Sequence, residues 1–205
     1  LIGVQEANAS IDSTWQSGGM FRICQGGRRG TRVMELWASD NDFASDQDEQ
    51  LSLDRHEGAI IVRYSNEMLC FDVLVTHAPV TRIISSIRKP WWVKVNNMLI
   101  GRKNKTKFPL IVLGDFNASI GSITSAGIGS RGESEEDANG KDLRLLIGKS
   151  SLIAPSTFDN LHTGDNFTYT SPCGHDSRKD YVLVDKIWKH AITTSIVEDK
   201  IDLSL

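Results

Sequence analysis

The feature that most constrains the fold is a series of short aliphatic runs, each bounded by Gly, Pro, Asp or Asn. Short runs that are rich in Val, Ile and Leu and are bounded in this way predict β-strands. The expected strands cover residues 1–4, 33–37, 59–64, 69–75, 110–113, 181–184 and 191–197. A chain with this pattern carries strands from one end to the other.

Helical periodicity is confined to two places. The apolar positions at spacing i, i+3, i+4 are Leu143, Leu146 and Ile147 in one and Trp91, Val95, Met98 and Leu99 in the other. Pro90 is expected in the first turn of the second helix, because the residue before a proline avoids the helical region. A separate turn over residues 83–87 is expected before it. Many strands with few helices predict an α/β sandwich, with sheets face to face and helices outside.

Composition limits the class of protein. The chain has 205 residues, 40% of them hydrophobic and 24% charged, which is the balance of one globular domain over residues 1–205. Its net charge of −3 argues against binding nucleic acid by bulk charge, although local basic loops could still do so. No apolar run approaches the ~20 residues of a membrane helix. Three cysteines without CxxC spacing argue against a disulfide framework and a zinc knuckle, and predict reduced thiols in an intracellular protein.

Two stretches read as solvated loops, residues 39–58 and 122–140, because both are polar, acidic and rich in Ser or Gly. A basic stretch, GRKNKTK at residues 101–107, leads into the start of the strand expected at 110–113. It is therefore expected to be a solvated turn at the end of that strand away from residue 115, roughly 20 Å distant at ~3.3 Å per residue.

The stretch LGDFNAS ends one of the aliphatic runs with Asp115 and Asn117, two residues apart. In a strand, alternate side chains share a face, so these two would point one way while Phe116 points into the core. An Asp and an Asn side by side can hold a water and an anionic oxygen at one point. The alternative is a turn, because Gly-Asp-x-Asn is also good turn chemistry. This stretch alone leaves the two interpretations open.

Three further strands carry a polar residue at one end. These residues are Glu6, His77 and Asp180. Each alone could be a strand-end cap or an exposed charge. If the strand ends gather at one edge, the side chains form a carboxylate-rich site, and oxygen ligands of this kind suit Mg²⁺ or Mn²⁺.

The motifs QE, THAPV, LGDFNAS and SRKDYVLV occur in the order and at roughly the spacing of the endonuclease/exonuclease/phosphatase superfamily, which the chain resembles over nearly its whole length. TYTSPCG followed by SRKDYVLV most resembles the endonuclease domains of LINE-type retrotransposons. The resemblance implies a DNase I-like, four-layer α/β/β/α sandwich of two mixed sheets. It also implies Mg²⁺-dependent or Mn²⁺-dependent phosphodiester hydrolysis, with DNA as the expected partner and nicking as the expected activity.

Residue roles follow from the resemblance position by position. It implies that Glu6 binds the metal, that Asp115 orients or deprotonates the attacking water, and that Asn117 holds the water or the phosphate. Asp180 matches the aspartate that orients a catalytic histidine. His77 stands where relatives commonly carry a phosphate-contacting Tyr, and it could bond a phosphate oxygen in its place.

The chain departs from the family pattern at both ends. No S-D-H motif is present, although the family's site ends with one, and no Asn-bearing strand precedes Leu1. The chain is therefore expected to be a fragment that is weakly active or inactive alone, because losing a donor to the phosphate costs about 2.7–4 kcal/mol of transition-state stabilisation. Lys179, where the family prefers Ile or Leu, is a minor departure.

The sequence constrains the substrate class less than it constrains the fold. A loop with Arg22, Arg28, Arg29 and Arg32 follows the Glu6 strand and reads either as a phosphate-contacting loop or as a solvated one. Ser177 stands where repair endonucleases carry a Trp, which argues against an abasic-site enzyme. The alternatives to a DNA-nicking enzyme are a phosphomonoesterase of the same superfamily and a catalytically dead retroelement remnant. No obligate protein partner is evident, and a nuclear location is expected if the chain nicks DNA.

Overall fold

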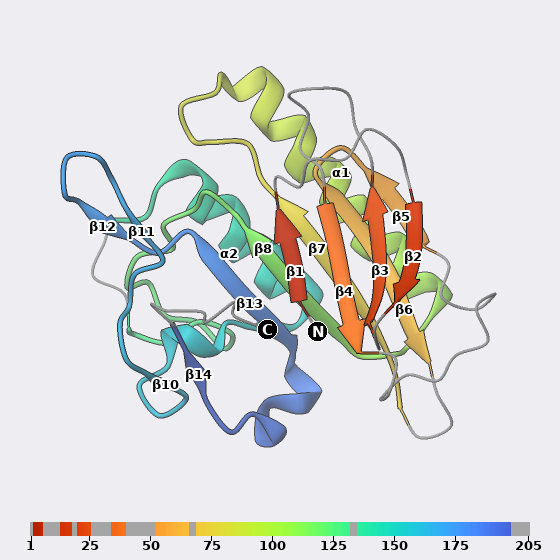
Figure 1. The fold of residues 1–205 in the computed structure, drawn as a ribbon. Coiled ribbons are helices and arrows are strands. Elements are labelled where there is room, and N and C mark those ends of the chain that lie inside the picture. Colours follow the sequence, from red (N-terminus) through yellow and green to blue (C-terminus); the bar gives the residue numbers. More distant parts are fainter. Residues whose placement is uncertain are drawn as a thin grey trace.

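The computed structural model describes residues 2–5, 13–17, 20–25, 34–39, 52–65, 69–131 and 135–197. Two long helices and two main sheets account for most of this part of the chain (Figure 1). The strands are β1 (Ile2–Gln5), β2 (Ser13–Ser17), β3 (Met20–Gln25), β4 (Met34–Ser39), β5 (Ser52–His56), β6 (Ala59–Ser65), β7 (Cys70–His77), β8 (Leu110–Asp115), β9 (Leu152–Ile153), β10 (His162–Thr163), β11 (Tyr169–Thr170), β12 (Asp176–Ser177), β13 (Asp180–Asp185) and β14 (Ser195–Ile196). The α-helices are α1 (Ser85–Lys105) and α2 (Ala138–Ser150), and the 3₁₀ helices are η1 (Pro155–Thr157) and η2 (Lys186–Ala191).

The larger sheet has six strands in the order β5-β6-β7-β8-β13-β9. Its only parallel pair among these described strands is β7 and β8, and the other neighbours are antiparallel. Parallel neighbours need a long crossover, and α1 supplies it between β7 and β8. This connection brings the ends of β7 and β8 to the same edge of the sheet.

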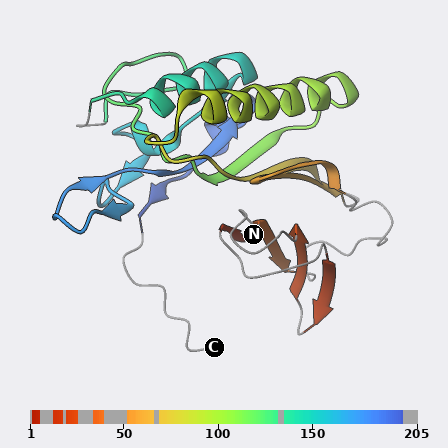
Figure 2. The same ribbon diagram turned by 90° about the horizontal axis from the view of Figure 1, so that it is seen from above.

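The smaller sheet has four strands in the order β1-β4-β3-β2, all antiparallel. It packs on the larger sheet through β1 and β4, which contact β7 and β8. Figure 2 shows the resulting layers, with both helices on the opposite face of the larger sheet. The predicted α/β sandwich is confirmed. Among the described residues no helix covers the outer face of the smaller sheet, so this part of the chain shows three of the four expected layers.

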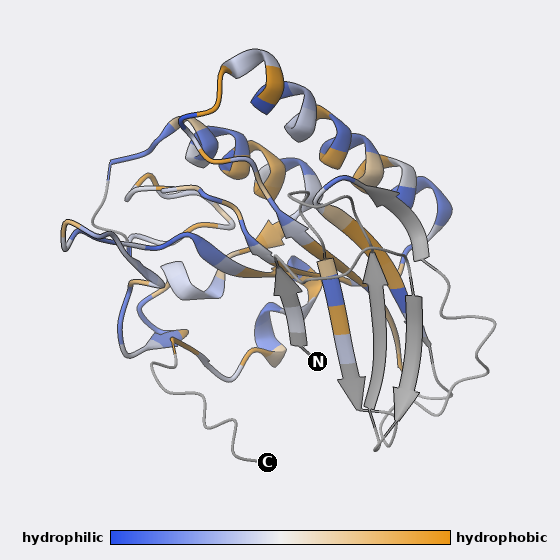
Figure 3. Cartoon of the chain, turned by 45° about the horizontal axis from the view of Figure 1, so that its top comes forward, coloured by the Kyte–Doolittle hydropathy of each residue, from blue (hydrophilic) through white to orange (hydrophobic). Residues whose placement is uncertain are grey.

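Two hydrophobic clusters fill the spaces between layers. One lies between the larger sheet and the helices, and the predicted positions of both helices belong to it. The other lies between the two sheets, where Met34 and Leu36 of β4 meet β6 and β7. Because β7 faces both clusters, its residues Phe71–His77 are all buried. Figure 3 shows the hydrophobic colour along the central strands and alternating colours along the helices.

The helix containing Pro90 differs from the prediction. α1 begins at Ser85, so Pro90 lies in its second turn and Ile87 belongs to the same helix rather than to a separate turn. A proline removes the hydrogen bond to the carbonyl four residues back, here that of Ser86. Only this one backbone bond is lost, and the helix continues through Lys105.

Several strand boundaries were also missed. Residues 52–56 of the expected loop form β5, and Arg22 lies in β3 rather than in a loop. The strand expected at 191–197 is reduced to β14, because η2 runs to Ala191. The expected loop at 122–140 buries Ile128 in the core and starts α2 at Ala138, so it is not wholly solvated.

Candidate active site

Three of the predicted site residues lie side by side across the larger sheet. His77 ends β7 and Asp115 ends β8, and the parallel register pairs the two. Asp180 begins β13, and the antiparallel register pairs it with Asp115 on the other side. Directly paired residues on neighbouring strands point to the same face. His77, Asp115 and Asp180 therefore form one row at the edge of the sheet.

The row faces the space between the two sheets. Val75 and Leu113, two residues earlier on β7 and β8, contact the core between the sheets. Nε2 of His77 lies 3.7 Å from Oδ2 of Asp115, and the side chain of His77 is 7% exposed while that of Asp115 is 28% exposed. Asp115 is thus the member of this pair that solvent and a substrate can reach.

Asn117 does not continue the strand. β8 ends at Asp115, and Asn117 has a φ of 45°, in the left-handed region that Asn tolerates better than most residues. Its backbone N–H donates to Oδ1 of Asp115 at 2.7 Å. The expected alternation is therefore wrong at Asn117, because a turn closed by the Asp115 carboxylate replaces the next strand residue. The turn and the site are not alternatives here, since the turn places both side chains at the sheet edge.

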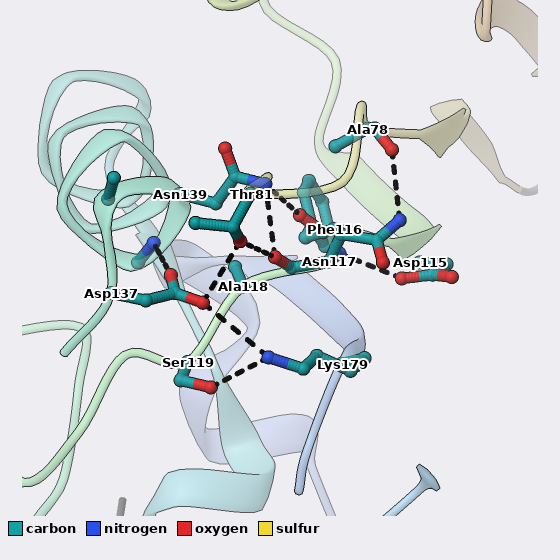
Figure 4. A network of polar contacts seen from close by, with 12 residues as sticks. Ala78, Thr81, Asp115, Phe116, Asn117, Ala118, Ser119, Asp137, Asn139 and Lys179 are labelled. Carbon is teal, nitrogen blue, oxygen red and sulfur yellow. Dashed lines mark hydrogen bonds and ion pairs between the residues drawn. The ribbon is translucent and has the colours of Figure 1, made fainter. Parts of the chain in front are cut away.

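The orientation of the Asn117 amide is determined by its partner. Nδ2 of Asn117 donates to the carbonyl oxygen of Ala78 at 3.0 Å (Figure 4). A carbonyl can only accept, so the nitrogen must face it and Oδ1 must face away. Among the described residues none donates to Oδ1 of Asn117, which leaves this oxygen available to a water or another donor.

Phe116 anchors the turn from the other face. Its ring is fully buried, stacks on Trp92 with centroids 6.1 Å apart and meets Tyr181 edge to face at 6.2 Å. Gly114 keeps this part of the sheet tight, because an added Cβ would lie 2.6 Å from Cγ2 of Thr76. The prediction that Phe116 points into the core is confirmed.

Asp180 is held by a residue that the sequence did not assign a role. The hydroxyl oxygen of Thr168 accepts hydrogen bonds from the backbone N–H groups of Lys179 (2.9 Å) and Asp180 (3.1 Å). Burial raises the pKa of Asp180 even though part of the residue remains exposed. The nearby charge of Asp115 raises this pKa further, whereas the Thr168 hydrogen bond and His77 lower it. Thr168 opens the quoted TYTSPCG motif, and this was the signal available in the sequence.

The remaining predicted residues are not placed in the row. Glu6, Arg28 and Arg29 lie outside the described residues. Glu6 directly follows β1, which contacts β7 and β8. Arg178 is buried and donates to the carbonyl oxygens of Asn166 and Arg131. Lys179 points to the helix face of the sheet, where Nζ donates to Ser119 at 2.9 Å.

A hard divalent cation would find only part of its ligands in the described site, which are the side-chain oxygens of Asp115, Asp180 and Asn117. They offer two carboxylates in paired positions and one free amide oxygen, all oxygen donors of the kind that Mg²⁺ and Mn²⁺ prefer. The charge of Asp115 raises the pKa of Asp180, and a cation between them would relieve that repulsion. Within the described part of the chain no group of three or more His, Cys, Asp or Glu residues forms a metal site. A complete set therefore needs a further ligand, and the sequence assigns that position to Glu6.

Comparisons with known proteins address the fold. No protein-family profile and no curated protein sequence matches the chain. Among solved structures, the endonuclease domain of TRAS1, a telomere-specific non-LTR retrotransposon, is 18% identical with a TM-score of 0.53, over 83% of this chain and 69% of that one. The AP endonuclease LMAP from Leishmania major is 11% identical with a TM-score of 0.57, over 82% of this chain and 62% of that one.

A third similar structure is a phosphatase. The mannosyl-6-phosphatase from Bacteroides thetaiotaomicron VPI-5482 is 13% identical with a TM-score of 0.51, over 82% of this chain and 63% of that one. This chain thus spans about two thirds of the length of the structures it matches. At such low identity the likeness concerns the backbone. Together with the two-sheet sandwich, it shows that the chain has a DNase I-like fold.

Proposed function

We propose that this protein hydrolyses phosphodiester bonds with the help of a divalent cation and nicks DNA. The observation that carries the proposal is the row of His77, Asp115 and Asp180 at one sheet edge, with the free Oδ1 of Asn117 beside it. Phosphodiester hydrolysis needs a placed water, a base and donors to the phosphoryl oxygens. This row offers each of these groups on rigid strand ends.

Each side chain has a role that its position permits. Asp115 accepts a proton from the attacking water, because its carboxylate is more exposed than the imidazole of His77 beside it. Asn117 fixes that water through Oδ1, which its bond to Ala78 directs away from the protein backbone. His77 donates to a phosphate oxygen from its place beside Asp115 in the row.

Asp115 and Asp180 would hold the cation together with Glu6. β1, which Glu6 follows in the sequence, contacts β7, and Figure 1 shows the arrowheads of both strands at the same end of the sandwich. When bound there, a divalent cation neutralises charge on the phosphoryl oxygens as a Lewis acid.

Two features favour a diester over a monoester as substrate. A phosphomonoester carries more charge and calls for cations around it, but Arg178 and Lys179, which flank the row in sequence, donate to groups of the protein itself. Two of the similar structures are described as an endonuclease domain and an AP endonuclease. Arg28 and Arg29 are proposed as contacts to the DNA backbone, and a nuclear location goes with this function. No helix among the described residues is long and apolar enough to cross a membrane.

The test is nicking of supercoiled plasmid by the full-length protein with Mg²⁺, against EDTA and against Asp115→Ala. We expect metal-dependent nicking that EDTA stops and that Asp115→Ala lowers by about 10²-fold to 10⁴-fold, the range for a lost general base. Asp159→Ala is the matched control, because this carboxylate is 75% exposed and lies outside the row. It should nick at the wild-type rate.

Three outcomes would contradict the proposal. Equal activity of Asp115→Ala and wild type would remove Asp115 from the site. Absence of nicking by a folded protein that releases phosphate from phosphomonoesters would identify a phosphatase. Absence of both activities, with folding verified by circular dichroism, would identify a catalytically dead remnant.

A further inference from the structure

A partly buried polar cluster lies directly behind Asn117, on the helix face of the larger sheet. It consists of Thr81 from the segment after β7, Asp137 and Asn139 at the start of α2, and Lys179 before β13 (Figure 4). The row of His77, Asp115 and Asp180 lies on the opposite face. The cluster therefore cannot touch a substrate in that row, but it contacts the backbone of Asn117.

Asn139 is the centre of the cluster. Its side chain is fully buried, and Nδ2 donates to the carbonyl oxygens of Pro79 (2.7 Å) and Asn117 (3.0 Å). Its Oδ1 accepts from Nη1 of Arg88 and Nε1 of Trp92, both at 3.0 Å. All four hydrogen-bonding positions of the amide are occupied. Asn139 thus joins α1 and α2 to the chain segments that follow β7 and β8.

Thr81 provides a second bond to the same carbonyl. Its hydroxyl lies 3.0 Å from the carbonyl oxygen of Asn117 and 3.2 Å from Oδ2 of Asp137. Asp137 is itself fixed, because its Oδ1 accepts from the backbone N–H of Gly140 and caps α2. The carbonyl of Asn117 is therefore held from two directions by groups that belong to two other segments.

The start of α2 is docked too closely to shift easily. A Cβ on Gly140 would lie 1.9 Å from the carbonyl oxygen of Ser119, and the N–H of Asp137 donates to that same oxygen at 3.0 Å. Since Ser119 is only two residues after Asn117, the helix start and the turn form one rigid unit. Lys179, the residue before β13, adds a bond to Ser119 at 2.9 Å.

We propose that Thr81 and Asn139 are positioning residues for Asn117, holding its carbonyl so that the left-handed turn directs Oδ1 toward the attacking water. The proposal rests on the function proposed above. Rotation of the Asn117 backbone would move its amide, and a displacement of about 1 Å in an active site can cost about 10²-fold in rate. Neither residue needs contact with substrate for this effect.

The test compares Thr81→Val with Thr81→Ser in the full-length protein. Val keeps the shape of the side chain and removes the hydroxyl, whereas Ser keeps the hydroxyl. We expect Thr81→Val to lower kcat for plasmid nicking by about 10-fold to 10²-fold with KM changed less than about twofold, and Thr81→Ser to keep most of the wild-type kcat. Thr157→Val is the control, because the hydroxyl of Thr157 also donates to a carbonyl, that of Ala154 at 2.7 Å, but lies outside the cluster.

A double-mutant cycle shows whether Thr81 acts through Asn117. In an Asn117→Ala background, Thr81→Val should cause little further loss of kcat. A full additional loss there, or an unchanged kcat in the single variant, would overturn the proposal.

A readout independent of activity separates this proposal from the proposed function. The side-chain amide resonances of Asn117 are assigned by their absence in Asn117→Ala. They should shift in Thr81→Val and in Asn139→Asp but not in Thr157→Val. If the wild type does not nick, the proposed function fails while these shifts still decide whether the cluster positions Asn117. Unchanged resonances in a folded Thr81→Val would overturn the positioning role.

Discussion

Asp180 binds its proton more tightly than an ordinary aspartate does. Its pKa is raised, first by burial and then by the charge of Asp115. This property belongs to the residue scale, and it can be measured without any substrate.

The stability of the protein should therefore depend on Asp180 in a defined pH window. Because its pKa is higher in the folded protein, the free energy of unfolding falls as pH rises from the ordinary value of 3.8 through the raised value. Asp180→Asn should remove this fall and unfold at higher urea concentration than wild type at neutral pH. Urea titrations at several pH values measure it, with Asp159→Asn as the exposed control. A variant with the wild-type pH dependence would show that Asp180 is not the titrating group.

Replacing Phe116 should lower the stability of the protein more than it changes the rate of the reaction. Removing a fully buried Phe ring that contacts Trp92 and Tyr181 is expected to cost about 3–5 kcal/mol. The matched control is Phe108→Ala, because Phe108 is 40% exposed and its ring lies under the guanidinium of Arg63. Its loss should cost about 1 kcal/mol or less. Chemical denaturation of both variants measures the difference. Similar costs for the two would contradict the anchoring role of Phe116.

At the scale of elements, the position of α2 depends on one glycine. Gly140→Ala would bring a Cβ to 1.9 Å from the carbonyl oxygen of Ser119, so the helix start must move away from the turn. We expect lower thermal stability and slower nicking, since Asn139 and Asp137 move with it. Gly148→Ala, in the same helix with no atom within 4 Å of the added Cβ, should instead stabilise by about 0.5–1 kcal/mol.

These two variants separate helix propensity from docking. Both replace a helical glycine of α2, so they gain the same intrinsic preference. If Gly140→Ala melted at or above the wild-type temperature and nicked normally, the close approach of α2 to Ser119 would not matter for the site.

At the scale of the whole molecule, a charged group stabilises the end of the sandwich away from the row. Asp72 is fully buried in β7 and accepts from Nε of Arg63 at 2.9 Å and from Nε of Arg102 at 2.7 Å. Arg102 also donates to the carbonyl of Phe108. The basic stretch at 101–107 therefore lies at the opposite end from Asp115, as predicted, but Arg102 is part of the structure rather than a solvated turn.

Asp72→Ala should lower stability without changing the chemistry. It leaves two arginines facing a buried gap, and loss of one partner of a buried ion pair costs about 3–5 kcal/mol. Asp72 pairs in register with the first residue of β8, about 17 Å from Asp115 at ~3.3 Å per residue. The folded variant should keep the wild-type kcat at low temperature. A loss of kcat larger than the loss of folded protein would show that the two ends are coupled.

The features that could be predicted from the sequence are those that a local residue pattern determines. The aliphatic runs that became β6, β7, β8 and β13 were visible because strands of a buried sheet are continuous in Val, Ile and Leu. The polar residues that end three of them, His77, Asp115 and Asp180, were visible because each breaks an apolar run. The position of Phe116 followed from alternation. By contrast, β2, β3 and β5 carry mixed polar residues, so their sequences did not separate them from loops.

Only the tertiary structure decided how Asn117 is held. No local pattern shows that Asn139, more than twenty residues later, would bond to the carbonyl of Asn117, or that Thr81 would reach the same atom from another segment. Those bonds exist because the α1 crossover makes β7 and β8 parallel neighbours and because Gly140 lets α2 approach Ser119. The sequence by itself determined which residues end the strands. The long-range packing of helices on the sheet decided their orientation, since hydrogen bonds between distant segments form only when the whole core has assembled.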